Sequence, residues 1–355
     1  MAAYPFRNLV FQGGGVKTFA YHGALRVLEE QGILQHIERV AGASAGALLA
    51  VLVSFRLSVE ETVRLFKTVD YSKITVTSKD LKWPRKPPPA IEREIEGLLG
   101  SLSALARLVR GYGWYTQDYP DDWVKETIAA QCQGNGRATF ADFRRQGFRD
   151  VAIVAANISA HSITVFSADT TPDVAVVDAV LMSGSIPFFF QALRFDGTRL
   201  GAGDYYADGG LLMNYPIQVF DDPRYEKGNP WYKHSINWQT LGCRLYTPQD
   251  CAQKEKPITN IIGYVENLFE TLVEAQVVDF ENSAADQLRT INISNCGVRT
   301  TDFDIRPAEG DARYAEMVQA GESAARDYLA GYELPGDTLD AIQARFAEFV
   351  ARWKR

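Results

Sequence analysis

The sequence predicts an α/β fold of three layers (α/β/α), with helices on both faces of a central, mostly parallel sheet and additional helices. Near the amino end, short apolar stretches that read as strands alternate with amphipathic helices, a pattern typical of parallel strands covered by helices. The first two strand-to-helix turns are also rich in glycine, at Gly13-Gly14-Gly15 and at Gly42-Ala43-Ser44-Ala45-Gly46. The 355 residues are enough for one large domain or two ordinary ones.

Composition limits the function classes. Hydrophobic residues make up 46% of the chain and charged residues 23%, which suits a globular protein with a sizeable core. The net charge of −7 argues against a nucleic-acid binder. The four cysteines include no C-x-x-C pair and cluster with no histidine, which speaks against a zinc site and suits a reduced, cytoplasmic protein. No signal peptide is recognisable, and the longest nearly apolar run, residues 43–55, is too short to span a bilayer. We therefore expect a cytoplasmic protein whose membrane contact, if it has one, is peripheral.

In the first part of the chain, two predicted strands each lead into a helix. A strand at 8–12 precedes a helix at 19–30, and a strand at 37–41 precedes a helix at 47–53. Ser58 and Glu61 form a capping box for a further helix that runs to about residue 69.

The remaining elements follow from the same patterns. We expect an irregular stretch at 71–90, an excursion outside the sheet at 221–255, and a long amphipathic helix at 258–280. The other predicted elements are helices at 91–110, 122–130, 174–182, 311–330 and 338–353, a capped turn at 139–142, and strands at 151–155, 163–167 and 290–294.

Two stretches allow a lipid-related and a plain interpretation. Basic residues between Lys79 and Lys86 surround Trp83 and precede three prolines, so this stretch is either a contact for an anionic lipid surface or a solvated loop. The run Phe188-Phe189-Phe190 belongs either to the core or to the wall of a lipid cleft.

Ser44 is the candidate nucleophile. It stands between a predicted strand and a predicted buried helix, which is the context of a nucleophile elbow. Gly42 and Gly46 remove the side chains two positions either side of the serine, as so sharp a turn requires. The N–H groups at the start of the following helix favour negative charge at Ser44. The same five residues also suit an ordinary tight turn.

The glycine turn at residues 13–18 admits several interpretations. A phosphate-binding P-loop needs glycine directly before Lys-Thr, where the chain has Val16, so that interpretation fails. A dinucleotide fingerprint would need glycine in place of Thr18 and an acidic residue at the end of the second strand, where Glu38 lies at its start. Consecutive glycines also suit an oxyanion hole, because their backbone N–H groups can approach a ligand oxygen. A plain turn between strand and helix stays open.

Asp208 is one candidate for the base that activates the serine. It follows a short strand and precedes Gly209-Gly210, so its carboxylate can project into a cleft, although Asp-Gly also favours plain turns. Burial would raise the basicity of such a carboxylate. The alternative base is a histidine, and the chain has only His22, His36, His161 and His234. Only His234 follows Asp208, as the order of an α/β-hydrolase triad requires, and none has the motif context of a catalytic histidine.

Three motifs in this order resemble the patatin-like phospholipase family in its bacterial form. The glycine loop of the family matches Gly13-Gly14-Gly15-Val16-Lys17, its Gly-x-Ser-x-Gly matches residues 42–46, and its Asp-Gly-Gly matches Asp208-Gly209-Gly210. Residues 179–190 and 300–304 also look alike, so the resemblance extends from about residue 9 to residue 329.

The resemblance implies one patatin-like domain over residues 1–355, with a core at about 8–329 and a helical tail at about 330–355. It implies a dyad in which Ser44 is the nucleophile and Asp208 the general base, with the oxyanion held by Gly13, Gly14 and Gly15. The implied reaction is hydrolysis of acyl esters of phospholipids or lysophospholipids through an acyl-enzyme, without calcium or another cofactor. The neighbouring motif positions are Lys17, Gly42, Gly46, Gly209 and Gly210.

The chain departs from the family at Thr18, where the loop motif has glycine, and this bears on which loop N–H groups act as donors. Thr18 could instead cap the following helix with its hydroxyl. Two other functions stay open: a non-catalytic lipid- or protein-binding module with the same fold, and an esterase of small or protein-linked acyl esters. The expected partner is a lipid ester and no nucleic acid, and the need for an activating partner is open.

Overall fold

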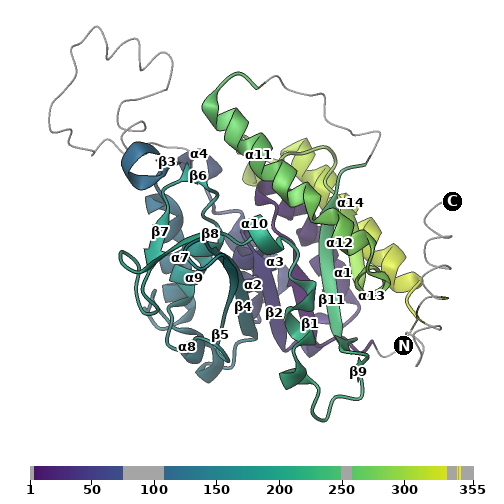
Figure 1. Cartoon of the computed structure of the whole chain (residues 1–355). Helices are drawn as coiled ribbons and strands as arrows, with labels where there is room; N and C mark the ends of the chain where they lie inside the picture. Colours follow the sequence, from purple (N-terminus) through teal and green to yellow (C-terminus); the bar gives the residue numbers. More distant parts are fainter. Residues whose placement is uncertain (1–3, 75–107, 249–257, 334–341, 343, 345–355) are drawn as a thin grey trace, which may run out of the picture.

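The computed structural model describes residues 4–74, 108–248, 258–333, 342 and 344. A sheet of eight strands runs through the centre, flanked by helices, which confirms the predicted fold class (Figure 1). The strand order is β12-β11-β1-β2-β4-β8-β7, and β5 lies along β4 as well. The pairs from β12 to β4 are parallel, whereas those made by β5, β7 and β8 are antiparallel. The strands of this sheet are β1 (Asn8–Phe11), β2 (Arg39–Ala43), β4 (Asp150–Asn157), β5 (Ser162–Ser167), β7 (Leu193–Phe195), β8 (Asp204–Asp208), β11 (Thr240–Tyr246) and β12 (Thr290–Ser294).

Helices follow most of the strands, and two small ribbons lie outside the main sheet. The α-helices are α1 (Tyr21–Glu30), α2 (Ala45–Ser54), α3 (Val59–Phe66), α4 (Tyr71–Ile74), α7 (Asp118–Gln131), α8 (Phe140–Arg145), α9 (Val176–Ser183), α10 (Gly210–Met213), α11 (Ile261–Ala275), α12 (Val277–Glu281), α13 (Ala284–Leu288) and α14 (Ala312–Ala330). The 3-10 helices are η1 (Gly15–Ala20), η2 (Leu34–His36), η3 (Ile217–Asp221), η4 (Pro223–Tyr225) and η6 (Pro307–Glu309). The ribbons pair β3 (Gly113–Tyr115) with β6 (Phe188–Phe190), and β9 (Tyr232–Lys233) with β10 (Ile236–Asn237).

Both faces of the sheet are buried because successive side chains of a strand point to opposite sides. Leu9 and Phe11 of β1 belong to the large core to which α1, α2, α3, α9 and α14 also contribute. Val10, between them, belongs to a smaller cluster with Ala41 of β2 and Phe220 of η3.

The two strands that lead to Ser44 and Asp208 share one edge of β4. The other edge of β4 is occupied by β5, which pairs with it from Ala152 to Asn157. β2 pairs in parallel with β4 as far as Val154, and β8 pairs antiparallel to β4 from Ala155 onward. β2 and β8 therefore run toward each other along the same edge, and their carboxyl ends meet where Val154 joins Ala155.

The prediction of an excursion outside the sheet at 221–255 is wrong for β11, which lies between β12 and β1. The sequence does not indicate this strand, because it contains glycine and arginine. The strand is also buried on both faces and therefore shows no alternation of polar and apolar residues. Gly242 is needed there, since a Cβ at this position would stand 1.7 Å from the Tyr215 hydroxyl. That hydroxyl shares a hydrogen bond of 2.7 Å with Thr290 Oγ1 of β12.

Other predictions are confirmed with small differences at their ends. The capping boxes at Ser58 and Thr139 are both formed. The predicted helix at 258–280 is interrupted at Gln276, between α11 and α12. The basic stretch from Lys79 to Lys86, most of the predicted helix at 91–110 and nearly all of that at 338–353 lie outside the described residues.

Candidate active site

Ser44 occupies a sharp turn between β2 and α2. Its backbone has a φ of 52° and a ψ of −130°, a conformation that a non-glycine residue adopts only under constraint. The turn depends on close backbone contacts at both flanking glycines. A Cβ on Gly42 would stand 2.3 Å from the Gly46 carbonyl oxygen, and one on Gly46 would stand 2.6 Å from the Phe11 carbonyl oxygen. The predicted strand-turn-helix context of Ser44 is therefore confirmed.

The Ser44 hydroxyl donates a hydrogen bond of 2.6 Å to Asp208 Oδ2. The other carboxylate oxygen, Oδ1, accepts a bond of 2.7 Å from the Gly210 N–H. Asp208 has no solvent exposure, and this burial raises the pKa of its carboxyl group from 3.8 to about 7. The hydrogen bonds from Ser44 and Gly210 act in the opposite direction, since they stabilise the charged form. The carboxylate can thus change protonation state near neutral pH while it touches the serine.

The glycine loop lies directly beside the serine. A Cβ on Gly13 would stand 3.1 Å from the Cβ of Ser44. The Gly13 N–H donates to the Asn214 carbonyl oxygen at 3.0 Å, so this donor is already used. Within the described part of the chain, the N–H groups of Gly14, Gly15 and Ala45 make no hydrogen bond.

Lys17 and Thr18, which follow the loop, are both buried. Lys17 Nζ forms an ion pair of 3.3 Å with Glu270 of α11, and the Thr300 hydroxyl donates to the same carboxylate. The Thr18 hydroxyl donates to the Gly15 carbonyl at 2.7 Å, so the suggestion that it caps the helix is wrong. Thr18 does not have a positive φ, and a side chain at this position therefore causes no backbone strain.

Ser183, at the end of α9, forms hydrogen bonds to the residues that follow both β2 and β8. The sequence alone did not indicate this role. Its hydroxyl accepts a 2.8 Å bond from the Ser44 N–H and donates a 2.6 Å bond to the Val154 carbonyl. Its own carbonyl accepts a 3.1 Å bond from the Gly209 N–H. A serine just before a helix-ending glycine is a common pattern, and only the meeting of β2 and β8 gives it this role.

We predict that Ser183→Ala destabilises the fold by about 1–3 kcal/mol, because it removes the acceptor of the partly buried Ser44 N–H and a donor to the buried Val154 carbonyl. The rate of ester hydrolysis should fall too, since the backbone N–H of Ser44 loses its hydrogen bond to Ser183. Urea unfolding and an ester assay measure both effects. Ser54→Ala is the matched control: it also removes a fully buried hydroxyl, but one whose hydrogen bond, among the described residues, goes to the Val51 carbonyl of its own helix. A Ser183 variant no worse than this control would contradict the assignment.

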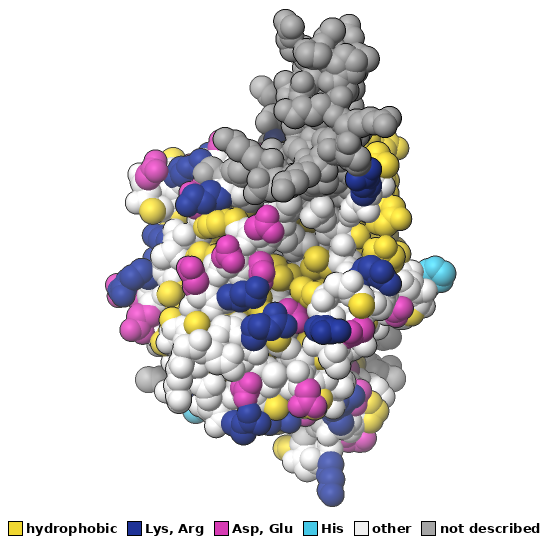
Figure 2. Space-filling model, turned by 90° about the vertical axis from the view of Figure 1, so that its left-hand side faces the viewer, with side chains coloured by type: hydrophobic (Ala, Val, Ile, Leu, Met, Phe, Trp, Pro, Cys, Tyr) yellow, Lys and Arg dark blue, Asp and Glu magenta, His cyan; other side chains and the backbone are white. Residues whose placement is uncertain are grey.

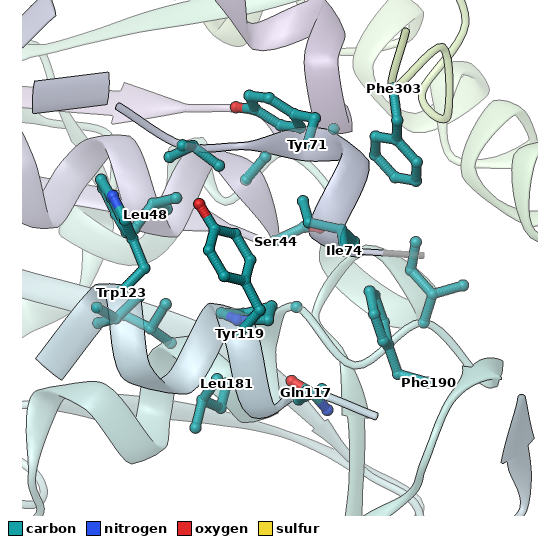
Figure 3. Close-up of a pocket in the computed structure, with 18 of the residues that line it drawn as sticks. Ser44, Leu48, Tyr71, Ile74, Gln117, Tyr119, Trp123, Leu181, Phe190 and Phe303 are labelled. Atoms are coloured by element: carbon teal, nitrogen blue, oxygen red, sulfur yellow. The ribbon is translucent and has the colours of Figure 1, made fainter. Parts of the chain in front are cut away.

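A cavity of about 130 Å³ opens beside Ser44 (Figure 3). Gly15, Ser44 and Ala45 line it together, so the N–H groups of Gly15 and Ala45 belong to residues of the same cavity. Most of the remaining lining is apolar or aromatic, which suits a hydrocarbon chain. In the run at 188–190, Phe189 is buried in the core and Phe190 lines the cavity, whereas Phe188 is half exposed and fits neither interpretation. Other lining residues are Leu48, Phe66, Val69, Tyr71, Ile74, Tyr119, Trp123, Leu181 and Phe303.

None of the four histidines, all within the described residues, forms a hydrogen bond with the serine hydroxyl, whose partner is Asp208. His22 is fully buried, and desolvation lowers its pKa to about 3, while its Nδ1 contacts the Tyr314 hydroxyl at 3.2 Å. His234 is exposed in the turn between β9 and β10, at the amino end of β11, whereas Ser44 follows the carboxyl end of the parallel strand β2. His36 and His161 are exposed.

The described residues contain no group of three or more histidine, cysteine, aspartate and glutamate side chains placed to hold a metal ion. Among them, no helix has both the length and the apolar character needed to cross a membrane.

Comparison with known proteins adds family information to this geometry. The family model for patatin-like phospholipases matches residues 9–221. YqhO of Bacillus subtilis is 30% identical over 272 residues, which cover 75% of this chain and 80% of that protein. A probable lipid hydrolase, 463L of invertebrate iridescent virus 6, is 21% identical and covers 64% of this chain and 68% of its own length. The crystal structure of VipD from Legionella pneumophila superposes with a TM-score of 0.56 at 18% identity, covering 94% of this chain and 69% of VipD, a likeness of fold.

Proposed function

The chain belongs to the patatin-like phospholipase family, and we propose that it hydrolyses acyl esters of phospholipids or lysophospholipids with Ser44 as nucleophile and Asp208 as general base. Family membership supports lipid hydrolysis in general. The observation that carries the assignment of roles is the 2.6 Å hydrogen bond from the Ser44 hydroxyl to the buried Asp208 carboxylate.

The proposed reaction has two halves. In the first, Asp208 accepts the hydroxyl proton as Ser44 Oγ attacks the ester carbonyl, and the proton then passes to the departing alcohol oxygen. In the second, Asp208 accepts a proton from water as the water attacks the acyl-serine. The bond between Ser44 Oγ and the acyl carbon then breaks, Asp208 returns the proton to Oγ, and the fatty acid is released. The raised pKa of about 7 makes Asp208 a stronger base than an exposed aspartate.

The proposed oxyanion donors are the N–H groups of Gly14, Gly15 and Ala45. Ala45 follows the nucleophile at the start of α2, where backbone N–H groups and the helix dipole both favour negative charge. Gly13 was expected to contribute as well, but its N–H is committed to Asn214. We assign Gly13 the role of fixing the loop against the chain that follows Asp208.

The experiment is fatty-acid release from phospholipid vesicles in the presence of a calcium chelator. We expect release by the wild type, because no step of the proposed reaction uses a metal ion. A small water-soluble ester is tested in parallel, since a preference for the soluble ester over the vesicles would favour an esterase of small substrates. Absence of hydrolysis of both substrates, together with failure of a fluorophosphonate to label the protein, would favour a non-catalytic binding module.

The pKa of Asp208 predicts the pH dependence of the reaction. The charged carboxylate is the active base, so kcat/KM for an uncharged ester should rise with pH and level off above about pH 7. Well below that pH the rate should fall about tenfold for each pH unit. A pH–rate profile on a neutral soluble ester measures this limb. A flat profile down to pH 5 would mean that Asp208 is not the base.

A further inference from the structure

The helix α11 carries an exposed apolar stripe. Ile261, Tyr264, Leu268 and Leu272 are between 41% and 55% exposed. Their spacing of three and four residues places them on one face of the helix. Figure 2 shows hydrophobic side chains gathered along the right-hand edge of the molecule, which corresponds to the front in Figure 1, where α11 lies. A surface helix normally turns charged or polar residues to the solvent. An exposed apolar stripe of this kind therefore indicates a surface that binds another molecule or a membrane.

The face of α11 next to the stripe packs close to the cavity beside Ser44. Val265 and Phe269 are buried in one cluster with Ile186 and Phe190, two residues that line the cavity. The helix also supports the site itself: Glu270 pairs with Lys17 behind the glycine loop. At its end, Gln276 donates to the Gly210 carbonyl at 2.8 Å. The exposed stripe therefore belongs to the same helix that backs the acyl cavity and holds both halves of the site.

The charges of α11 indicate what kind of surface the stripe fits. The helix has no lysine or arginine, and its three glutamates, Glu266, Glu270 and Glu274, recur at spacings of four on a different face from the stripe. Tyr264 adds an aromatic ring with a polar tip, a residue type favoured at the boundary between lipid and water. The stripe is thus apolar without basic residues, which suits zwitterionic lipid better than anionic lipid.

We propose that the apolar stripe of α11 is the face that docks on the surface of zwitterionic phospholipid and so brings the cavity beside Ser44 to its substrate. This rests on the proposed function for the choice of lipid as the occupant. A second copy of the chain on the stripe is the competing occupant, and the test below distinguishes the two.

The test compares vesicle binding by two variants, both made in a Ser44→Ala background so that hydrolysis cannot alter the membrane. The double variant Leu268→Asn/Leu272→Asn removes the middle of the stripe. Ile163→Asn is the matched control, because Ile163 is also an exposed aliphatic residue, 39% exposed, on β5 away from α11 in Figure 1. We expect the double variant to bind phosphatidylcholine vesicles at least about tenfold more weakly, since apolar contact drives such binding. The control should bind like its parent, and added salt should change the binding little.

A second readout uses proteins with Ser44 intact. The double variant should lose hydrolysis of vesicle phospholipid and keep hydrolysis of a short soluble ester, because the catalytic groups are unchanged. Unchanged vesicle binding by the double variant would overturn the proposal. So would a wild type that is dimeric by light scattering and becomes monomeric in the double variant without any change in vesicle binding. If vesicle binding depends on the stripe but no hydrolysis is detected, the docking face stands and the proposed function fails.

Discussion

Replacing Ser44 by alanine is expected to abolish lipid ester hydrolysis, with a loss of roughly 10⁴–10⁶-fold in kcat. The variant keeps the Cβ and therefore the shape of the turn, but it has no oxygen that could attack the ester. What remains is the weak catalysis by bound water near the oxyanion donors. Fatty-acid release from vesicles under calcium chelation measures the loss.

A measurement of the stability of this variant shows whether the loss of activity comes from the missing hydroxyl or from unfolding. The Ser44 backbone N–H still donates to Ser183, so the elbow should stay in place. We expect the free energy of unfolding to fall by about 1–3 kcal/mol, because the buried Asp208 carboxylate loses the hydrogen bond from the hydroxyl, and this loss should leave the protein folded. Retention of a large part of the activity by a folded Ser44→Ala protein would show that the nucleophile is elsewhere.

Replacing Asp208 by asparagine is expected to lower kcat by roughly 10³–10⁴-fold. Asparagine has nearly the same shape, and its oxygen can still accept the hydrogen bond from the Gly210 N–H. It cannot take the serine proton, however, so the hydroxyl stays a poor nucleophile. The same vesicle assay measures the effect. His234→Ala serves as the comparison, and it should leave activity unchanged because His234 lies in an exposed turn.

The same Asp208→Asn variant should be more stable than the wild type at neutral and alkaline pH. Burial raises the pKa of Asp208 in the folded state from 3.8 to about 7, so the folded protein holds a proton that the unfolded chain has already released. The stability contributed by this group is therefore complete below pH 4 and is lost as the pH rises to about 7. The variant has no such loss, which predicts a gain on the order of 2–4 kcal/mol at pH 8 that disappears near pH 4. Thermal or urea unfolding at the two pH values checks this sign, and a destabilised variant at pH 8 would contradict it.

The sequence was sufficient for the parts of the site that short motifs encode. Ser44 and its two glycines could be recognised because a sharp strand-to-helix turn needs small residues at fixed spacing. The residues alone left the base undecided between Asp208 and a histidine. The structure puts Asp208 on the serine because β2 and β8 meet end to end along β4, a long-range pairing that no local pattern records.

Features that depend on packing between distant segments were not predictable. β11 was not predicted, in part because it contains Gly242. This glycine is needed to make room for Tyr215, which lies 27 positions earlier in the sequence. Ser183 acquires its role only when Ser44 and Val154 approach it from separate strands. The break at Gln276 likewise coincides with hydrogen bonds from its side chain to the segment after Asp208, where it also accepts a 2.8 Å bond from the Asn214 N–H.

If Ser44 is a nucleophile activated by Asp208, a fluorophosphonate should react with its hydroxyl, and mass spectrometry of the labelled protein locates the adduct. The wild type should carry the adduct on the peptide that contains Ser44, and Asp208→Asn should be labelled far more slowly under the same conditions. An adduct on another residue, or lipid hydrolysis that continues after Ser44 is fully modified, would show that Ser44 is not the nucleophile.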